Sequence, residues 1–144
     1  MKTQFRSMKK ADIQKIKDAG LEFVLMENTK GIVGEMNGKM ACAAVFDSWA
    51  HTSVCVHQLI LNPFCIRHGF FEEVAKYVYV QADRAIMYGL VRSSNKKAIK
   101  LDLNIGFTEI ARLKDGVMFG EDLVILELKK EDCRFLPKDY REAA

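Results

Sequence analysis

Apolar and polar positions alternate with a helical period in two parts of the chain. In Lys9–Ala19, Ile13 and Ile16 recur at helical spacing, and Gly20 supplies a left-handed stop just after them. Phe70–Arg84 carries a longer apolar stripe along one side. The pattern therefore predicts one helix near the start of the chain and one in its middle.

A third helix is predicted to begin after Ser94 or Asn95, because either side chain can cap a helix N-terminus. The residues expected to face inward follow helical spacing and are Ala98, Leu101 and Ile105. Gly106 then ends the helix.

Seven further segments are short and apolar or alternate with a period of two, as strands do. They are Phe23–Met26, Ile32–Met36, Met40–Asp47, Ser53–Asn62, Ala85–Arg92, Phe107–Leu113 and Asp122–Lys129. The pair Asn37 and Gly38 predicts a tight hairpin, since both residues tolerate positive φ. A turn-rich loop through Asp115, Gly116 and Gly120 is expected between the last two strands.

The order of these elements predicts the fold class. The strand–helix–strand unit 53–92 favours a parallel pair, because its helix must cross back over the sheet, whereas the neighbouring strands favour antiparallel pairing. We expect a mixed, mostly antiparallel sheet of about six to seven strands with helices on both faces, in the α/β or α+β class. Residues 1–144 form one predicted domain, whose polar tail, 131–144, packs only at its start.

The composition is that of an ordinary globular protein, with 144 residues, 49% hydrophobic and 28% charged. The longest apolar run, Met40–Phe46, is far shorter than the roughly 20 residues that span a bilayer. Met1–Lys10 is polar and lacks the pattern of a signal peptide. We therefore expect a cytoplasmic protein without a membrane partner.

Charge and cysteines narrow the function classes further. The net charge is +3, and the basic clusters are only pairs, which disfavours a nucleic-acid partner. None of the four cysteines, Cys42, Cys55, Cys65 and Cys133, forms a C-x-x-C pair. We therefore predict no metal site and reduced thiols.

Three motifs carry a resemblance to a known family. The block from Asn95 to Phe107 follows the pattern N-x-x-A-x-x-L-x-x-x-x-G-F, between the fifth and sixth strands. Leu59–Pro63 ends the fourth strand in a proline, and the chain closes its sheet with an apolar β pair. Over about residues 5–130 the sequence resembles the GCN5-related N-acetyltransferases (GNAT superfamily), particularly small bacteriophage-encoded members. The resemblance implies an acyl-CoA N-acyltransferase-like fold.

The resemblance also implies a binding site for acetyl-CoA. In the family, backbone N–H groups in a loop with the pattern Q/R-x-x-G-x-G/A hold the pyrophosphate. Here Ile66, Gly69 and Phe71 occupy the three patterned positions, so only Gly69 matches, and the aromatic ring of Phe71 is expected to crowd the phosphate. Arg67 and His68 are the nearest substitutes for the missing cation; a plain loop that caps a helix is the alternative.

The remaining residues implied for the cofactor lie on the strand before this loop and on the third helix. The resemblance places the pantetheine arm against the backbone of Leu59, Ile60 and Leu61, and the pyrophosphate against the amides of Arg67, His68, Gly69 and Phe70. Asn95 is expected to assist at the pantetheine arm, although helix capping alone explains an asparagine there.

Two residues are candidates for proton transfer. His57, near the middle of the fourth strand, is the candidate base, because an imidazole exchanges a proton near neutral pH; a partly buried structural histidine is the alternative. Asp102 stands where the family has a tyrosine that protonates the leaving thiolate, and it is expected to be a poor acid unless burial raises its pKa. His51 is read as a solvated turn residue, or as part of an acceptor pocket with Asp47 and Trp49.

The function implied is transfer of an acetyl group from acetyl-CoA to an amine on a small molecule or a protein. The alternative is a catalytically inactive protein with the same fold, serving a bacteriophage as a structural, assembly or host-interaction factor. The replacements at Ile66, Phe71 and Asp102 favour that alternative. Only the net charge supports a nucleic-acid function. Homodimers that form through an exposed strand edge are common in this fold.

Overall fold

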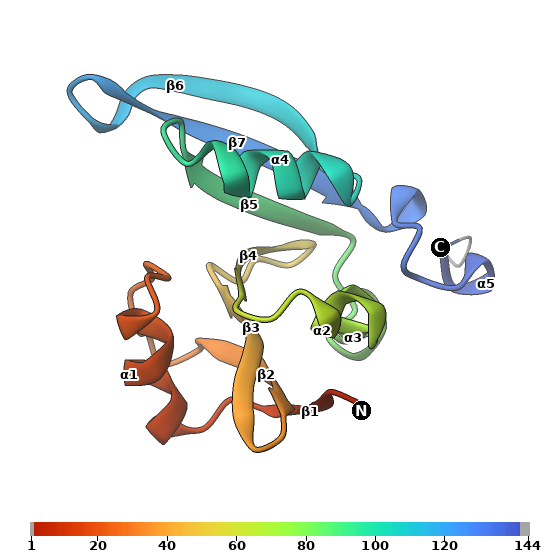
Figure 1. Cartoon of the computed structure of the whole chain (residues 1–144). Helices are drawn as coiled ribbons and strands as arrows, with labels where there is room; N and C mark the ends of the chain where they lie inside the picture. Colours follow the sequence, from red (N-terminus) through yellow and green to blue (C-terminus); the bar gives the residue numbers. More distant parts are fainter. Residues whose placement is uncertain (1, 142–144) are drawn as a thin grey trace.

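The computed structural model describes residues 2–141, which are built around one sheet of seven strands (Figure 1). The strands are β1 (Gln4–Ser7), β2 (Lys30–Met36), β3 (Lys39–Asp47), β4 (Ser53–Ile60), β5 (Ile86–Arg92), β6 (Thr108–Met118) and β7 (Glu121–Lys129). Their order is β1-β2-β3-β4-β5-β7-β6, and every neighbouring pair is antiparallel except β4 with β5. The predicted mixed sheet is confirmed, including its parallel pair.

Helices cover the sheet and connect its strands. They are α1 (Lys10–Asp18), α2 (Phe64–Arg67), α3 (Phe70–Ala75), the π-helix η1 (Lys76–Gln81), α4 (Lys96–Asn104), the 3₁₀-helix η2 (Lys130–Asp132) and α5 (Lys138–Arg141). The segment α3–η1 is continuous and forms the crossover between the parallel strands β4 and β5.

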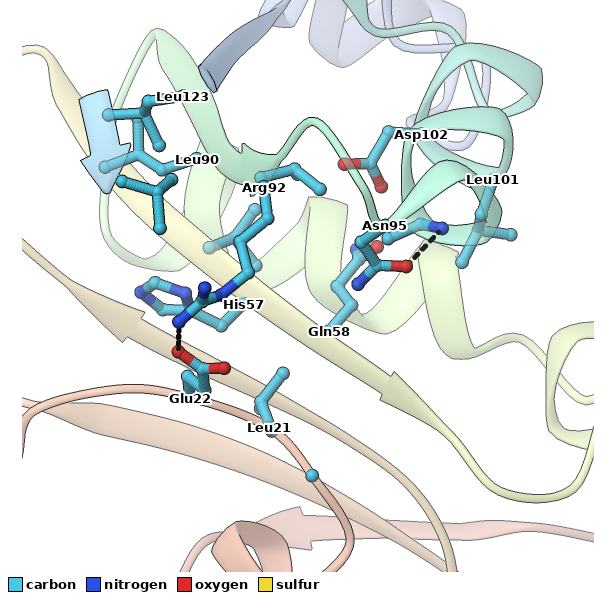
Figure 2. Close-up of a pocket in the computed structure, with 15 residues that line it drawn as sticks. Leu21, Glu22, His57, Gln58, Leu90, Arg92, Asn95, Leu101, Asp102 and Leu123 are labelled. Carbon is cyan, nitrogen blue, oxygen red and sulfur yellow. Dashed lines mark hydrogen bonds and ion pairs between the residues drawn. The ribbon is translucent and has the colours of Figure 1, made fainter. Parts of the chain in front are cut away.

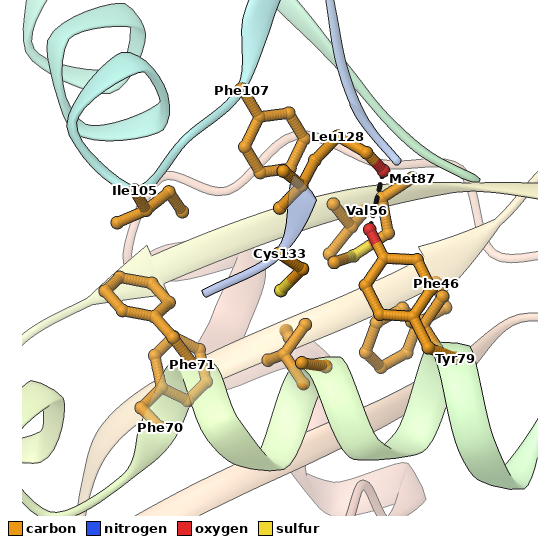
Figure 3. Close-up of a cluster of buried hydrophobic side chains, with 14 of the residues drawn as sticks. Phe46, Val56, Phe70, Phe71, Tyr79, Met87, Ile105, Phe107, Leu128 and Cys133 are labelled. Atoms are coloured by element: carbon orange, nitrogen blue, oxygen red, sulfur yellow. Dashed lines mark hydrogen bonds between the residues drawn. The ribbon is translucent and has the colours of Figure 1, made fainter. Parts of the chain in front are cut away.

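Alternate residues of β3 pack on opposite faces of the sheet. Ala43 and Val45 join Ile16 of α1 in a small buried cluster. Phe46 belongs to the larger cluster on the other face, where α3, η1 and the residues after α4 contribute side chains (Figure 3). In that cluster the buried Tyr79 hydroxyl donates a hydrogen bond of 2.6 Å to the backbone oxygen of Leu128. Helices on both faces are therefore confirmed, with α1 on one face and α3, η1 and α4 on the other.

Local turn chemistry accounts for the elements that were predicted most closely. Asn37 and Gly38 adopt φ values of 55° and 74° and join β2 to β3 as the predicted hairpin. Asn95 caps α4, and Gly106, at φ 113°, follows its end. These positions allow only a narrow range of backbone conformations, so neighbouring residues determine them.

One predicted strand is absent at the N-terminal edge of the sheet, and one observed strand was not predicted. Phe23–Met26 is an irregular segment rather than a strand, and Val24 and Met26 are exposed. The outer edge of β2 is occupied by the unpredicted β1, which pairs Phe5 with Gly34. Because β1 occupies the edge of β2, Phe23–Met26 lies across the α1 face without a strand partner.

Other element boundaries also differ. The predicted loop through Asp115, Gly116 and Gly120 is shorter, because β6 continues to Met118. Asp115 adopts φ 57° within an irregularity of the β6–β7 ladder, which absorbs the turn-forming residues without ending the strand. The middle helix stops at Gln81 rather than Arg84.

At the C-terminal end, Cys133 and Leu136 are buried and the short α5 follows. Residues 142–144 of the predicted tail lie outside the described part of the chain.

Candidate functional site

The parallel strands β4 and β5 separate in the middle of the sheet. Their ladder pairs Ser53 with Ile86 and ends where Cys55 pairs with Tyr88. Beyond that point β4 stays paired with β3 as far as Ile60, and β5 stays paired with β7. The facing edges of the two strands therefore enclose a wedge-shaped gap in which backbone N–H and C=O groups lack a strand partner.

A cavity of about 290 Å³, called here the gap cavity, occupies this wedge. Its strand residues are Val56, His57, Gln58, Leu90, Val91 and Arg92. The loop after α1 closes it on one face of the sheet through Leu21 and Glu22, and α4 closes it on the other through Asn95 and Asp102. Figure 2 shows labelled residues of the loop after α1, of β4, of β5 and of α4 around this cavity.

Asp102 is brought to the cavity by α4 and lies against the backbone of β5. A Cβ atom added at Gly89 would come within 3.1 Å of Asp102 Oδ2, so the glycine leaves the space that the carboxyl group uses. Burial raises the pKa of Asp102 to about 7, because the surrounding protein solvates the ionised form poorly. At neutral pH a large share of Asp102 is therefore protonated and able to donate a proton.

Gln58 provides an unsatisfied polar atom in the same cavity. Its Oε1 atom is buried and has no hydrogen-bond partner among the described residues. A buried acceptor without a donor costs free energy, and native proteins seldom leave one unless a ligand or water completes it. The gap cavity therefore offers a hydrogen-bond acceptor to a ligand that carries an N–H or O–H group.

His57 lies on the opposite face of β4 from Gln58 and is held by a neighbouring strand. Its Nε2 atom is 3.0 Å from both carboxylate oxygens of Asp47, the last residue of β3. Since a carboxylate only accepts hydrogen bonds, the shared proton belongs to Nε2. The neutral imidazole then keeps its lone pair on Nδ1.

A second cavity, called here the loop cavity, lies on the α1 face beneath residues 21–28. Its polar lining includes Lys17, Asp47 and His57. Four residues line both cavities, namely Leu21, Glu22, His57 and Leu90. His57 therefore lies where the two cavities meet.

The predicted pocket for the acceptor substrate, made of Asp47, Trp49 and His51, is only partly formed. Asp47 and Trp49 line the loop cavity, whereas His51 is exposed in the turn before β4 and is not part of either cavity lining. The indole Nε1 of Trp49 donates to the backbone oxygen of Asn28 at 2.8 Å, which connects the turn after β3 to the segment before β2.

Asn95 performs the capping role that its residue type suggests. Its Oδ1 atom accepts a hydrogen bond of 3.2 Å from the Ala98 backbone N–H. The side chain is nevertheless at the edge of the gap cavity, so its amide nitrogen remains near the space between the strands.

The loop after β4 contains a helical turn, α2, that was not predicted. Gly69 follows it at φ 98° and begins the continuous helix α3–η1; a Cβ added there would meet no atom within 4 Å. The backbone N–H groups of His68 and Gly69 already donate to oxygens of Phe64 and Ile66. The His68 side chain is hydrogen bonded to Thr3 Oγ1 through Nδ1 at 2.8 Å, and Arg67 is exposed.

The expected crowding by Phe71 does not occur. Its side chain is buried in the larger core cluster, with ring centroids 5.4 Å from Phe70 and 5.2 Å from Phe135. Helix geometry points it into the core, because it lies on the same stripe as Val74. The space in front of Gly69 is therefore open.

The strand residues expected at the cofactor divide between the two faces. Leu59 packs with the α1 cluster, Ile60 with the larger cluster, and Leu61 is exposed just beyond the strand. Of the described residues, none in 59–70 contributes to the lining of the gap cavity.

The sequence did not indicate Gly89 or Gln58 as site residues, and it suggested Asp47 only as part of an acceptor pocket. A glycine inside an apolar strand is a signal for close approach of another group, and it would have directed attention to β5. The register that places Asp47 beside His57 is a tertiary feature with no local signal.

Residues 2–141 contain neither a metal-binding cluster nor a helix that could span a membrane. No three histidine, cysteine, aspartate or glutamate side chains there gather closely enough to bind a metal ion. None of the helices in this part has the length and apolar character needed to cross a bilayer. The four cysteines are free thiols, as predicted.

Comparison with known proteins supports the fold through structure rather than sequence. No family model matches the chain, and no curated protein matches it significantly. A mutant of the spermidine N-acetyltransferase SpeG from Vibrio cholerae superposes with a TM-score of 0.72 and 14% identity, over 96% of this chain and 98% of that one. A chimera of the same enzyme with hSSAT gives 0.70 and 15%, over 90% and 96%.

A third similar structure is a protein from Desulfovibrio desulfuricans with a provisional assignment as an acetyltransferase of the GNAT family. It superposes with a TM-score of 0.69 and 14% identity, over 88% of this chain and 98% of that one. Identities this low establish shared architecture rather than shared substrates. The chain therefore has the fold of GNAT acetyltransferases, as the sequence resemblance implied.

Proposed function

We propose that the protein is an N-acetyltransferase that moves an acetyl group from acetyl-CoA to an amine. The observation that carries this proposal is the gap between β4 and β5, with a protonatable carboxyl group on one face of the sheet and a carboxylate-bound histidine on the other. Acyl transfer needs both a base for the amine and an acid for the departing sulfur.

The gap fits an extended chain with amide groups. The unpaired backbone edge of β4 and the buried Oε1 atom of Gln58 offer hydrogen bonds to the pantetheine arm of acetyl-CoA, and Asn95 lies at the same cavity. We assign the diphosphate to the start of α3–η1. There Phe70 and Phe71 are the first helical residues after Gly69, and the opening N–H groups of a helix lack intrahelical partners.

His57 is the proposed base. With Asp47 holding the Nε2 proton, Nδ1 is the atom that accepts a proton from the amine as its nitrogen attacks the thioester carbonyl. Asp47 acts through His57 as a positioning residue, in the way that a carboxylate fixes the imidazole of a hydrolytic triad.

Asp102 is the proposed acid. Acetyl-CoA supplies an acyl group already activated as a thioester, and its sulfur leaves as a thiolate when the C–S bond breaks. A protonated Asp102 neutralises that sulfur, and its pKa of about 7 lies well above the ordinary range, which suits an acid working near neutral pH. From the sequence, Asp102 was a reason to expect an inactive protein. In its buried environment, Asp102 supports the proposed catalysis instead.

The proposal extends to a cytoplasmic location, a homodimer through an exposed strand edge and kinship with bacteriophage-encoded members, for which the sequence pattern and the fold are the support. The non-catalytic alternative gains no support from the similar structures, which carry the names of acetyltransferases.

The decisive experiment is a thermal melt with acetyl-CoA followed by an amine screen. A ligand at 100 times its Kd adds about 2.7 kcal/mol, which raises the melting temperature of a chain this long by roughly 5–10 °C. Release of free thiol that requires an added amine would establish transfer. Absence of any melting shift with acetyl-CoA, CoA or longer acyl-CoAs would favour the non-catalytic alternative.

A further inference from the structure

We propose that the loop cavity selects a primary amine carried on an uncharged apolar body, such as an arylalkylamine, and rejects polyamines. This inference rests on the proposed acetyl transfer and adds the class of acceptor. The amine lies at His57, where the loop cavity meets the gap cavity, and the apolar body lies under residues 21–28.

The lining of the loop cavity is mainly apolar away from His57. Its apolar members come from the segment after α1 and from β5 and the turn after β3: Leu21, Phe23, Val24, Met26, Trp49 and Leu90. Val24 and Met26 are 71% and 59% exposed, which is unusual for side chains of this size that line a concave surface. Covering them with an apolar ligand removes hydrocarbon from water and stabilises the complex.

Trp49 gives this lining a rigid aromatic wall. Its indole N–H is bonded to Asn28, and its ring packs at 6.2 Å from Tyr77 in an edge-on arrangement. The guanidinium carbon of Arg84 lies 5.1 Å from the indole centroid. A ring held by three contacts loses little conformational freedom when a flat apolar group packs beside it.

The charges of the cavity argue against a polycation. Its two carboxylates already have partners: Asp47 accepts a hydrogen bond from His57 at 3.0 Å, and Glu22 forms an ion pair with Arg92 at 2.8 Å. Lys17 also lines the cavity, where its Nζ atom lies 5.2 Å from the Phe23 ring centroid. A second or third ammonium group would therefore meet cations and apolar carbon instead of a free carboxylate.

The test compares two amines on the intact protein in the presence of acetyl-CoA. 2-Phenylethylamine represents the proposed class, and spermidine, the substrate named for the SpeG structures, represents the polyamines. We expect kcat/KM for 2-phenylethylamine, measured as thiol release, to exceed that for spermidine by at least about tenfold, the discrimination that one or two well-placed apolar groups provide. A preference for spermidine would overturn the inference.

Two matched variants test whether the loop cavity causes the preference for 2-phenylethylamine over spermidine. Val24→Glu places a charge in the lining, whereas Leu25→Glu makes the same change at the next residue, which is 49% exposed and outside the lining. Val24→Glu should lower kcat/KM for 2-phenylethylamine by about tenfold or more and leave the melting shift with acetyl-CoA unchanged. Leu25→Glu should match the parent protein, and equal effects of the two variants would remove the loop cavity from the acceptor site.

The outcomes separate this inference from the proposed function. If acetyl-CoA does not raise the melting temperature of the parent protein, the proposed acetyltransferase function is contradicted. A retained shift together with turnover of spermidine but not of 2-phenylethylamine contradicts only the acceptor class.

Discussion

At the scale of single residues, the chemistry of the site depends on surroundings more than on residue type. An aspartate is normally ionised at neutral pH, yet Asp102 is enclosed by α4 and the bare backbone of Gly89, and burial raises its pKa to about 7. His57 is positioned in the same way by its strand neighbour Asp47. Each role needs one residue to act and a second to shape its environment.

Replacement of Asp102 by asparagine should change how stability depends on pH. The folded protein holds the Asp102 proton up to about pH 7, whereas the unfolded chain releases it near 3.8, so stability falls as pH rises between these values and stays low above them. Asp102→Asn removes this loss and should stabilise the protein at pH 8 by up to about 4 kcal/mol. Urea denaturation at pH 5 and pH 8 measures it; an identical pH dependence in both proteins would contradict the raised pKa.

Replacement of His57 should impair turnover most at neutral pH. At pH 7 an amine acceptor is mostly protonated and needs a base, whereas at pH 10 much of it has lost the proton unaided. His57→Ala is expected to lower kcat/KM by about 100-fold at pH 7 and by much less at pH 10. His51→Ala, at an exposed position outside both cavities, is the control, and a loss independent of pH would exclude a base role for His57.

At the scale of elements, the loop between β4 and α3 is the proposed binding site of the diphosphate. The helical turn α2 uses the N–H groups of His68 and Gly69, and the positive φ of Gly69 turns the chain into the longer helix. The buried ring of Phe71 anchors that helix to the core. Glycine is needed at 69 for the backbone conformation, and its missing side chain also leaves the approach open.

Two substitutions at Gly69 separate conformation from charge. Gly69→Glu should abolish the melting shift with acetyl-CoA, because a carboxylate faces the diphosphate, and the left-handed backbone should lower stability by about 1–2 kcal/mol. Gly69→Asn, which tolerates the same φ without a charge, should keep the shift, as should Gly120→Glu at another positive-φ glycine. Melting curves with and without ligand provide the measurement. Binding retained by Gly69→Glu would show that the diphosphate lies elsewhere.

Elements determined by neighbouring residues were predicted well from the sequence. The hairpin at Asn37 and Gly38 and the capped helix α4 follow from local backbone preferences. Phe23–Met26 was misassigned because a strand needs a pairing partner, and the free edge of β2 is paired with β1. Pairing between distant segments is a tertiary property that local patterns do not contain.

The candidate site was likewise predicted in part, through local sequence features and not through contacts between distant segments. The family-like spacing indicated His57, Asn95 and Asp102, and the structure places all three at one cavity. The sequence did not reveal that Asp102 is buried or that Asp47 holds the His57 ring, because both depend on register across strands.

At the scale of the whole molecule, the separation of β4 from β5 divides an otherwise continuous sheet. Strands β1–β4 form one half and β5, β7 and β6 the other, joined by a parallel ladder of only a few residues and by the α3–η1 crossover (Figure 1). A ligand in the gap contacts both halves at once. Its binding should therefore restrain the sheet where the sheet is least connected.

Hydrogen exchange can detect this restraint. Acetyl-CoA is expected to slow amide exchange in 56–60, where alternate N–H groups face the gap without a strand partner, and at Phe70 and Phe71, the first helical residues after Gly69. It should leave the β2–β3 hairpin unchanged. Mass spectrometry of peptides from the liganded and free protein makes the comparison. Uniform slowing over the whole chain, including the hairpin, would indicate global stabilisation instead of binding in the gap.

The placement of the two cavities has a kinetic consequence. The gap cavity reaches the face covered by α4, the loop cavity lies on the face covered by α1, and they share His57. Under the proposed function, donor and acceptor would enter from opposite faces and could occupy the protein together, so the acyl group would have no need to rest on a side chain between two half-reactions. Double-reciprocal plots of initial velocity at several fixed acetyl-CoA concentrations should intersect, whereas parallel lines would mean that one product departs before the second substrate arrives.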